Sequence, residues 1–153
     1  MSNKFMPIIY WRNMADRLCI LVDLNIVLDV IQNRQPFYEE SARVLDVVAR
    51  GEAKGLLAAH SITNLYYVIN QARNRQTATA AIDNLLAAFI IAAVDDAVIR
   101  KAFSWGWSDF EDAVQMAAAL QGDANYLITR KTRDFQDGFV PVVQPGAFLA
   151  LLN

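Results

Sequence analysis

The sequence predicts an α/β domain with three layers, in which helices cover both faces of a mainly parallel sheet of about five strands. Short apolar segments alternate with helical segments along most of the chain, and this alternation is typical of βαβ units. The first apolar segment, 18–22, has no polar position and ends at Asp23. Such a strand is expected in a sheet that is buried on both faces.

The composition favours one packed domain and excludes several functional classes. The chain has 153 residues, of which 55% are hydrophobic and 20% charged, which excludes a disordered chain. The formal net charge of −2 gives no general attraction for a polyanion, so any contact with nucleic acid must be local. The longest apolar run, 85–94, is too short to span a bilayer. Because the lone Cys19 favours a reducing compartment, we expect a cytoplasmic protein without a membrane segment.

The elements after the first strand follow from helix and strand signals in chain order. Residues 25–31 are expected to be helical. Pro36 and the acidic residues after it open a crossover helix, which Gly51 closes. Residues 55–59 form the second strand, and Ser61 is expected to cap the helix that follows.

The same signals continue in the second half of the chain. Thr77 is expected to cap another helix, which leads to a third strand at 90–94. Asp95 caps the next helix, and a capping box that begins at Ser108 opens the helix after it. The alternation of strands and helices therefore persists.

The last expected strands are 126–129 and a weaker one at 139–143, which Pro141 confines to an edge of the sheet. A final short helix follows. We expect residues 18–153 to form one domain. Residues 1–17 are expected to be an N-terminal arm, either loosely attached or an artefact of the start site.

Three carboxylates are candidates for a functional site. In open α/β sheets, ligands bind beyond the carboxyl ends of the strands. Asp23 ends the first strand, Asp134 lies just beyond the fourth, and Asp112 lies on the helix that leads into the fourth. Taken alone, Asp23 could simply cap a helix, and Asp134 could be a turn residue.

Asp112 is harder to explain as a structural residue. If Ser108 is the cap, Asp109 and Glu111 already serve the free amides and the helix dipole. The helical period then places Asp112 on a poorly solvated side, whereas Glu111 and Gln115 share the wetter side. An acid on a poorly solvated side needs a partner.

A divalent cation would be that partner if the three acids meet. Crowded carboxylates all stay ionised near neutral pH only with a cation among them. Oxygen ligands, without a His or Cys set at zinc spacing, favour Mg²⁺ or Mn²⁺. Arg130, Lys131 and Arg133 flank the last acid and could hold phosphates, although a solvated charged loop is the alternative.

Four motifs resemble, in order, those of the PIN domain family. They are 22–29 (VDLNIVLD), 61–67 (SITNLYY), 109–113 (DFEDA) and 129–135 (TRKTRDF). The resemblance covers nearly the whole chain after about residue 18. PIN domains are α/β nucleases that depend on Mg²⁺ or Mn²⁺, and many small bacterial members are VapC-like ribonuclease toxins held inactive by an antitoxin.

The resemblance implies that Asp23, Asp112 and Asp134 are the metal-binding and catalytic acids. Asn25 and Thr129 would be supporting polar groups. The implied reaction is hydrolysis of RNA phosphodiester bonds with Mg²⁺ or Mn²⁺ as the cofactor. The implied partners are an RNA substrate and an antitoxin protein, and a homodimer is also compatible with the apolar helices.

Two positions depart from the family pattern. The family usually has a glutamate where this chain has Asn64, whose supporting amide can bind or hydrogen-bond but carries no charge. It commonly has an asparagine where this chain has Lys131. Asp29, Glu39 and Glu40 could supply the missing carboxylate, although the two glutamates also suit the first turn of their helix.

Two other functions stay open. A haloacid-dehalogenase-like phosphatase also carries an aspartate after its first strand, but the second acid of its usual pair is Asn25 here. A catalytically weak module that binds RNA or protein on the same fold would fit the change at Asn64. The lone His60 is expected to be structural, because no nucleophile pairs with it in the sequence.

Overall fold

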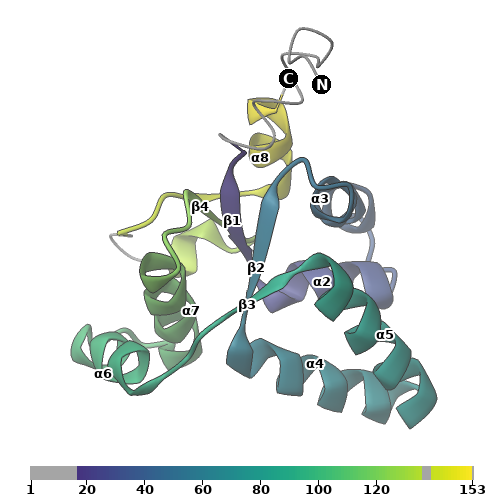
Figure 1. Cartoon of the computed structure of the whole chain (residues 1–153), viewed down its shortest axis with the longest axis horizontal. Coiled ribbons are helices and arrows are strands. Elements are labelled where there is room, and N and C mark those ends of the chain that lie inside the picture. Colours follow the sequence, from purple (N-terminus) through teal and green to yellow (C-terminus); the bar gives the residue numbers. More distant parts are fainter. Residues whose placement is uncertain (1–16, 136–138, 153) are drawn as a thin grey trace, which may run out of the picture.

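The computed structural model describes residues 17–135 and 139–152, which contain a parallel sheet of five strands (Figure 1). The strands are β1 (Cys19–Val22), β2 (Lys54–Ala58), β3 (Ile90–Ala92), β4 (Tyr126–Ile128) and β5 (Val142–Val143). Their order across the sheet is β3-β2-β1-β4-β5, and every neighbouring pair is parallel. The predicted parallel sheet is confirmed.

Helices cover both faces of this sheet, so the predicted three layers are also confirmed. The helices are α2 (Leu24–Ile31), α3 (Tyr38–Ala49), α4 (Ala59–Ala72), α5 (Arg75–Ala88), α6 (Asp96–Ser104), α7 (Phe110–Gln121) and α8 (Pro145–Leu151). Figure 1 shows α6 and α7 together on one side of the sheet and α2, α3 and α5 on the other. A short 3₁₀ turn, η2 (Thr132–Asp134), follows β4.

The central strand β1 contributes to two hydrophobic cores. Ile20 and Val22 pack in the core beneath α2, α3, α4, α5 and α8. Leu21 packs in the core beneath α6 and α7. All three side chains are fully buried, because both faces of the strand are covered by helices. This burial explains why the segment has no alternating polar positions.

The register of the central strands determines where the site can form. Val22 of β1 pairs with Ile128 of β4. The backbone N–H of Asp23 donates to the carbonyl oxygen of Ile128 at 2.9 Å. Because parallel strands run in the same direction, Asp23 and Thr129 emerge side by side at the carboxyl edge of the sheet.

Two helices begin differently from the sequence-based expectation. Asn74, and not Thr77, caps α5, and its Oδ1 accepts a hydrogen bond from the Thr77 backbone N–H at 2.7 Å. Asp109, and not Ser108, caps α7, and its Oδ1 accepts from the backbone N–H of Asp112 at 3.1 Å. In both cases a short Asx side chain, placed three residues before a free amide, makes the cap.

The remaining helix starts and the edge strand can be compared in the same way. Ser61 lies inside α4 and is buried, so it does not cap that helix. Asp95 caps α6 as predicted, with its Oδ1 accepting from the Val98 backbone N–H at 3.0 Å. The last strand, β5, lies at an edge as predicted, directly after Pro141.

Two further predictions concern the N-terminal arm and the absence of a membrane-spanning segment. The predicted N-terminal arm lies, apart from Arg17, outside the described residues. In the described part of the chain, no helix combines the length and the apolar character needed to cross a membrane.

Candidate functional site

Asp23 joins three elements at the carboxyl edge of the sheet, and only 2% of its surface is exposed. It caps α2, because its Oδ1 accepts a hydrogen bond from the Asn25 backbone N–H at 3.3 Å. The Thr129 Oγ1 after β4 donates to Asp23 Oδ2 at 2.8 Å. Gln115 Nε2 of α7 donates to Asp23 Oδ1 at 3.1 Å. Asp23 is therefore a helix cap and also the meeting point of β1, β4 and α7.

Asp112 is a buried acid that lacks a complete set of partners. It lies in the first turn of α7, and only 6% of its surface is exposed. Its Oδ2 is buried and has no hydrogen-bond partner within the described residues. Burial is the main cause that raises the pKa of Asp112 to about 8. Nearby carboxylates raise the pKa further, namely those of Asp109, Glu111 and Asp23, whereas the charge of Lys131 lowers it.

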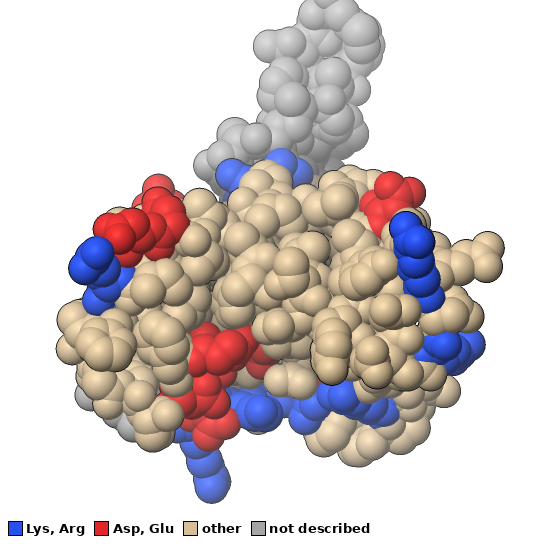
Figure 2. Space-filling model, turned by 90° about the horizontal axis from the view of Figure 1, so that it is seen from below, with Lys and Arg blue, Asp and Glu red and all other residues tan. Residues whose placement is uncertain are grey.

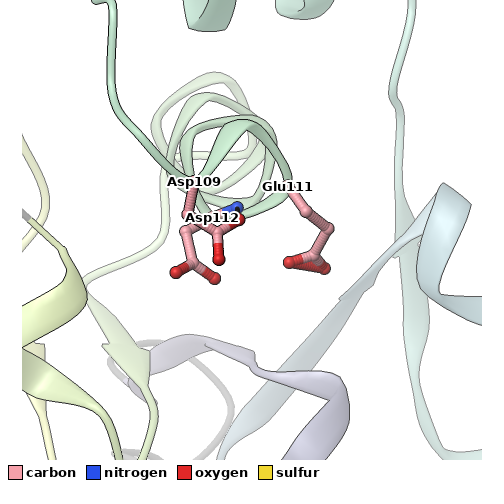
Figure 3. Close-up of side chains that lie close together, drawn as sticks. All are labelled: Asp109, Glu111 and Asp112. Carbon is pink, nitrogen blue, oxygen red and sulfur yellow. Dashed lines mark hydrogen bonds between the residues drawn. The ribbon is translucent and has the colours of Figure 1, made fainter.

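The first turn of α7 gathers three acids. One carboxylate oxygen from each of Asp109, Glu111 and Asp112 lies within 4.8 Å of the others. Figure 3 shows the three side chains extending from the same turn of the helix. Asp23 also borders this region, because Gln115 Nε2 contacts both Asp23 Oδ1 and Glu111 Oε1. The structure thus places Asp23 near Asp112, and beside them lie Asp109 and Glu111, which the sequence analysis assigned to the free amides and the helix dipole.

Gln115 and His60 are the polar residues that sequence reasoning missed. Gln115 is fully buried, so its predicted position on the wetter side of the helix is wrong. Its Nε2 donates to Glu111 Oε1 at 3.2 Å as well as to Asp23. His60 of α4 places its Nε2 at 3.2 Å from Glu111 Oε1. A glutamine within the otherwise apolar segment 113–119 was the available sequence signal.

The other predicted site residues lie outside this cluster. Asp134 is exposed in η2, and its carboxylate has no hydrogen-bond or ion-pair partner among the described residues. Asn64 is exposed on α4. Asn25 is half-buried, and its side-chain Oδ1 accepts a hydrogen bond from Arg34 Nη1 at 3.5 Å. The side chain of Thr129, by contrast, directly supports Asp23.

Arg130 is committed to a buried ion pair behind the site. Its Nε and Nη2 donate to the two carboxylate oxygens of Asp29 at 2.7 and 2.9 Å. Asp29 is fully buried and also accepts a hydrogen bond from Ser41 Oγ at 3.0 Å. The guanidinium carbon of Arg130 lies 3.9 Å from the centre of the Phe37 ring. This arrangement leaves Arg130 less available for phosphate than the exposed Lys131.

Basic side chains adjoin the acids at this edge of the sheet. Lys131 and Arg133 are exposed beyond β4. Figure 2 views the molecule from the side of the strand ends and shows an acidic patch next to several basic side chains. The formal net charge is only −2, yet acidic and basic side chains lie close together on this surface.

The fold and the site define an α/β protein with an acidic centre at the carboxyl edge of a parallel sheet. The profile described as PIN domain matches residues 19–133, which is most of the chain. The protein therefore belongs to the PIN domain family, as its motifs indicated. Among curated proteins no sequence match was found.

Solved structures with the same fold come from toxin-antitoxin systems. VapBC-1 from nontypeable Haemophilus influenzae has a TM-score of 0.64 at 16% identity, covering 84% of this chain and 99% of that chain. A toxin-antitoxin complex from Klebsiella pneumoniae has a TM-score of 0.63 at 20% identity, covering 82% and 97%. VapC20 from Mycobacterium tuberculosis, described as a Sarcin-Ricin loop cleaving toxin, has a TM-score of 0.58 at 15% identity, covering 71% and 86%. These similarities establish a shared fold.

Proposed function

We propose that the protein is a metal-dependent endoribonuclease that hydrolyses RNA phosphodiester bonds and acts as the toxin of a toxin-antitoxin pair. The observation that carries the proposal is Asp112, a buried carboxylate with an unpartnered oxygen beside three other acids. Burial of an uncompensated negative charge is unfavourable, and a cation removes that penalty. Membership of the PIN domain family supports the same activity.

The residues present fit a hard divalent cation. The acids beside Asp112 offer oxygen atoms only, and carboxylate oxygens are the ligands that Mg²⁺ and Mn²⁺ prefer. The buried Oδ2 of Asp112 forms no hydrogen bond within the described residues, so it is available to bind a cation. We therefore propose Mg²⁺ or Mn²⁺ as the cofactor, with Asp23 and Asp112 as metal-binding and catalytic acids. Asp134 is proposed as the third such acid from its motif alone, because its exposed carboxylate lies outside the cluster.

Each group around the site has a distinct proposed task. When bound, the cation supplies positive charge that favours attack of water on phosphorus. Thr129 holds the Asp23 carboxylate through its hydroxyl group. Lys131 and Arg133 would bind the flanking phosphates, because both are exposed cations next to the site. Asn25 and Asn64 would contribute only neutral polar contacts.

The proposed substrate and partner follow from the solved relatives. One relative is described as a toxin that cleaves the Sarcin-Ricin loop, and others were solved as toxin-antitoxin complexes. An RNA substrate and a protein antitoxin are accordingly the partners we propose. The homodimer and the cytoplasmic location stay predictions. The phosphatase alternative loses its support, because the family match accounts for the aspartate after β1.

The decisive experiment compares RNA cleavage by the full chain and by two aspartate variants. Purified protein is incubated with a panel of labelled RNAs in Mg²⁺, Mn²⁺ or EDTA. We expect cleavage that EDTA abolishes, loss of cleavage in Asp112→Asn, and retention in Asp83→Asn, whose side chain is exposed on α5.

Two results would count against the nuclease. Cleavage by Asp112→Asn at the wild-type rate would exclude Asp112 from the reaction. If the wild type binds RNA and Mn²⁺ but never turns over, the catalytically weak binding module becomes the better description. Circular dichroism and thermal melts of each variant establish that the fold is intact.

A further inference from the structure

We propose that Glu111 is an additional ligand of the cation beside Asp112, and that His60 and Gln115 are positioning residues that fix the Glu111 carboxylate. The inference rests on the proposed metal-dependent function and extends the same site by three residues. It gives a role to a set of contacts that connects α4, α7 and the end of β1.

The spacing of the acids suits one bound ion. Oxygen atoms that bind a single Mg²⁺ at about 2.1 Å lie at most about 4.2 Å apart. One oxygen from each of Asp109, Glu111 and Asp112 already lies within 4.8 Å of the others. The Glu111 and Asp112 oxygens are therefore within about 0.6 Å of the spacing that one shared ion requires.

A separate observation indicates that a ligand belongs at this position. Asp112 is more than nine-tenths buried, yet its Oδ2 has no partner among the described residues. Figure 3 shows the Asp112 side chain beside that of Asp109, with Glu111 extending from the other side of the same turn. A buried polar atom without a partner is rare in folded proteins, and a missing ion is one of its physical explanations.

Two nitrogen groups from different elements hold the Glu111 carboxylate in place. His60 Nε2 lies 3.2 Å from Glu111 Oε1 and comes from the first turn of α4. Gln115 Nε2 carries two N–H groups, one for Glu111 Oε1 and one for Asp23 Oδ1. The amide thereby couples two carboxylates from different elements at one place. Groups that orient a metal ligand in this way raise the affinity for the metal.

The other acids considered as a replacement for the uncharged Asn64 are engaged or lie apart. Asp29 is bound by Arg130 and by a serine hydroxyl. The Glu40 carboxylate packs against Gly146 at the start of α8. Glu39 is exposed on α3. Of the two acids outside the original set within 4.8 Å of Asp112, Asp109 is already engaged as the cap of α7, so Glu111 is the one without an assigned role.

The test measures Mn²⁺ binding by the metal-free full chain, using electron paramagnetic resonance of free Mn²⁺ and calorimetry. Glu111→Gln keeps the size and hydrogen-bonding capacity of the side chain but removes its charge. We expect a loss of affinity of at least about 10-fold in this variant, within the range that supporting residues of metal sites show. Glu39→Gln is the matched control and should bind within about 2-fold of wild type. Equal affinity of Glu111→Gln and wild type would overturn the proposal.

A second pair of variants tests the positioning role of His60. His60→Gln keeps a nitrogen donor at about the place of Nε2, whereas His60→Leu removes it. We expect about a 10-fold weaker Mn²⁺ affinity for His60→Leu and recovery in His60→Gln, at unchanged melting temperature. If His60→Leu binds Mn²⁺ like the wild type, His60 does not position Glu111.

The outcomes separate this inference from the proposed function. A wild type that binds no Mn²⁺ and cleaves no RNA contradicts both. A wild type that binds Mn²⁺ and cleaves RNA, with Glu111→Gln unchanged in both respects, contradicts only the role of Glu111.

Discussion

Asp29 and Asp112 are both buried carboxylates, but within residues 17–135 and 139–152 only Asp29 forms an ion pair. Asp29 receives two hydrogen bonds from Arg130 and one from Ser41, so both of its oxygens are engaged. Asp112 has one buried oxygen without a partner, and its near neighbours are other acids. The first arrangement is complete within the fold, whereas we propose that a cation from solution completes the second.

The comparison shows how two equally buried acids can differ in their surroundings. Burial alone does not separate the two, because both side chains are almost fully buried. The difference lies in the charge of what surrounds them. A buried ion pair keeps its acid ionised at the cost of desolvating two groups. A buried acid among other acids resists ionisation. Protons and metal ions therefore compete for its oxygen atoms.

The largest expected effect comes from removing the arginine of the Asp29–Arg130 ion pair. Arg130→Met leaves Asp29 buried without its charged partner, and we expect the free energy of unfolding to fall by about 3–5 kcal/mol. Urea denaturation measures it, with the exposed Arg133→Met as a control that changes stability by less than about 0.5 kcal/mol. A loss below about 1 kcal/mol would mean that Arg34, whose Nη1 lies 3.9 Å from Asp29 Oδ1, takes over the pairing.

Binding of a metal ion beside Asp112 should stabilise the protein. Mn²⁺ at 100 times its dissociation constant is expected to add about 2.7 kcal/mol to the free energy of unfolding. At a fixed Mn²⁺ concentration, the increase in Tm should be larger at pH 8 than at pH 6. The reason is that the raised pKa of Asp112, about 8, leaves a proton for the ion to displace at lower pH. Melting curves in Mn²⁺ and in EDTA measure the difference, and equal shifts at both pH values would contradict it.

Removing the charge of Asp112 should give a smaller stabilisation of the metal-free protein. The folded chain keeps this proton up to about pH 8, whereas the unfolded chain loses it near the ordinary value of 3.8. Asp112 therefore lowers stability progressively as the pH rises from about 4 to 8. Asp112→Asn abolishes this dependence, and we expect it to be more stable than wild type by about 2 kcal/mol at pH 8 in EDTA. A difference that is the same at pH 4 and pH 8 would contradict the raised pKa.

The smallest effect comes from removing the hydrogen bond that Ser41 donates to Asp29. Ser41→Ala removes one of the donors to Asp29 but leaves its arginine, so we expect a loss of about 1 kcal/mol in the free energy of unfolding. Ser108→Ala is the control, since Asp109 and not Ser108 caps α7. It should change stability by less than about 0.5 kcal/mol. If Ser108→Ala costs as much as a lost helix cap, Ser108 contributes to the start of α7 after all.

Local patterns were sufficient to predict the strands and the positions of two site acids. The apolar run before Asp23 predicted β1, and the rule for parallel sheets then placed the site at the carboxyl edge. Helical periodicity correctly placed Asp112 on a poorly solvated side of α7. It failed for Gln115, because that residue is buried by contacts with Asp23 and Glu111 at the end of β1 and the start of α7.

Contacts between distant parts of the chain could not be predicted from these patterns. His60 and Glu111 are 51 residues apart, and Asp29 and Arg130 are 101 residues apart. No local period relates such residues, and only the packing of α4, α7 and the strands brings them together. The sequence analysis therefore found neither the contact of His60 with Glu111 nor the ion pair of Arg130 with Asp29.

The pairing of Val22 with Ile128 also has a consequence for the time at which the site is formed during synthesis. Asp23 is made early, but its hydroxyl partner, Thr129, follows a strand that is made more than a hundred residues later. A shift of two residues along β4 would move Thr129 by about 6.6 Å and break that contact. A growing chain therefore contains Asp23 long before the contact between Asp23 and Thr129 can form. That contact forms only after β4 has been made and has paired in register with β1.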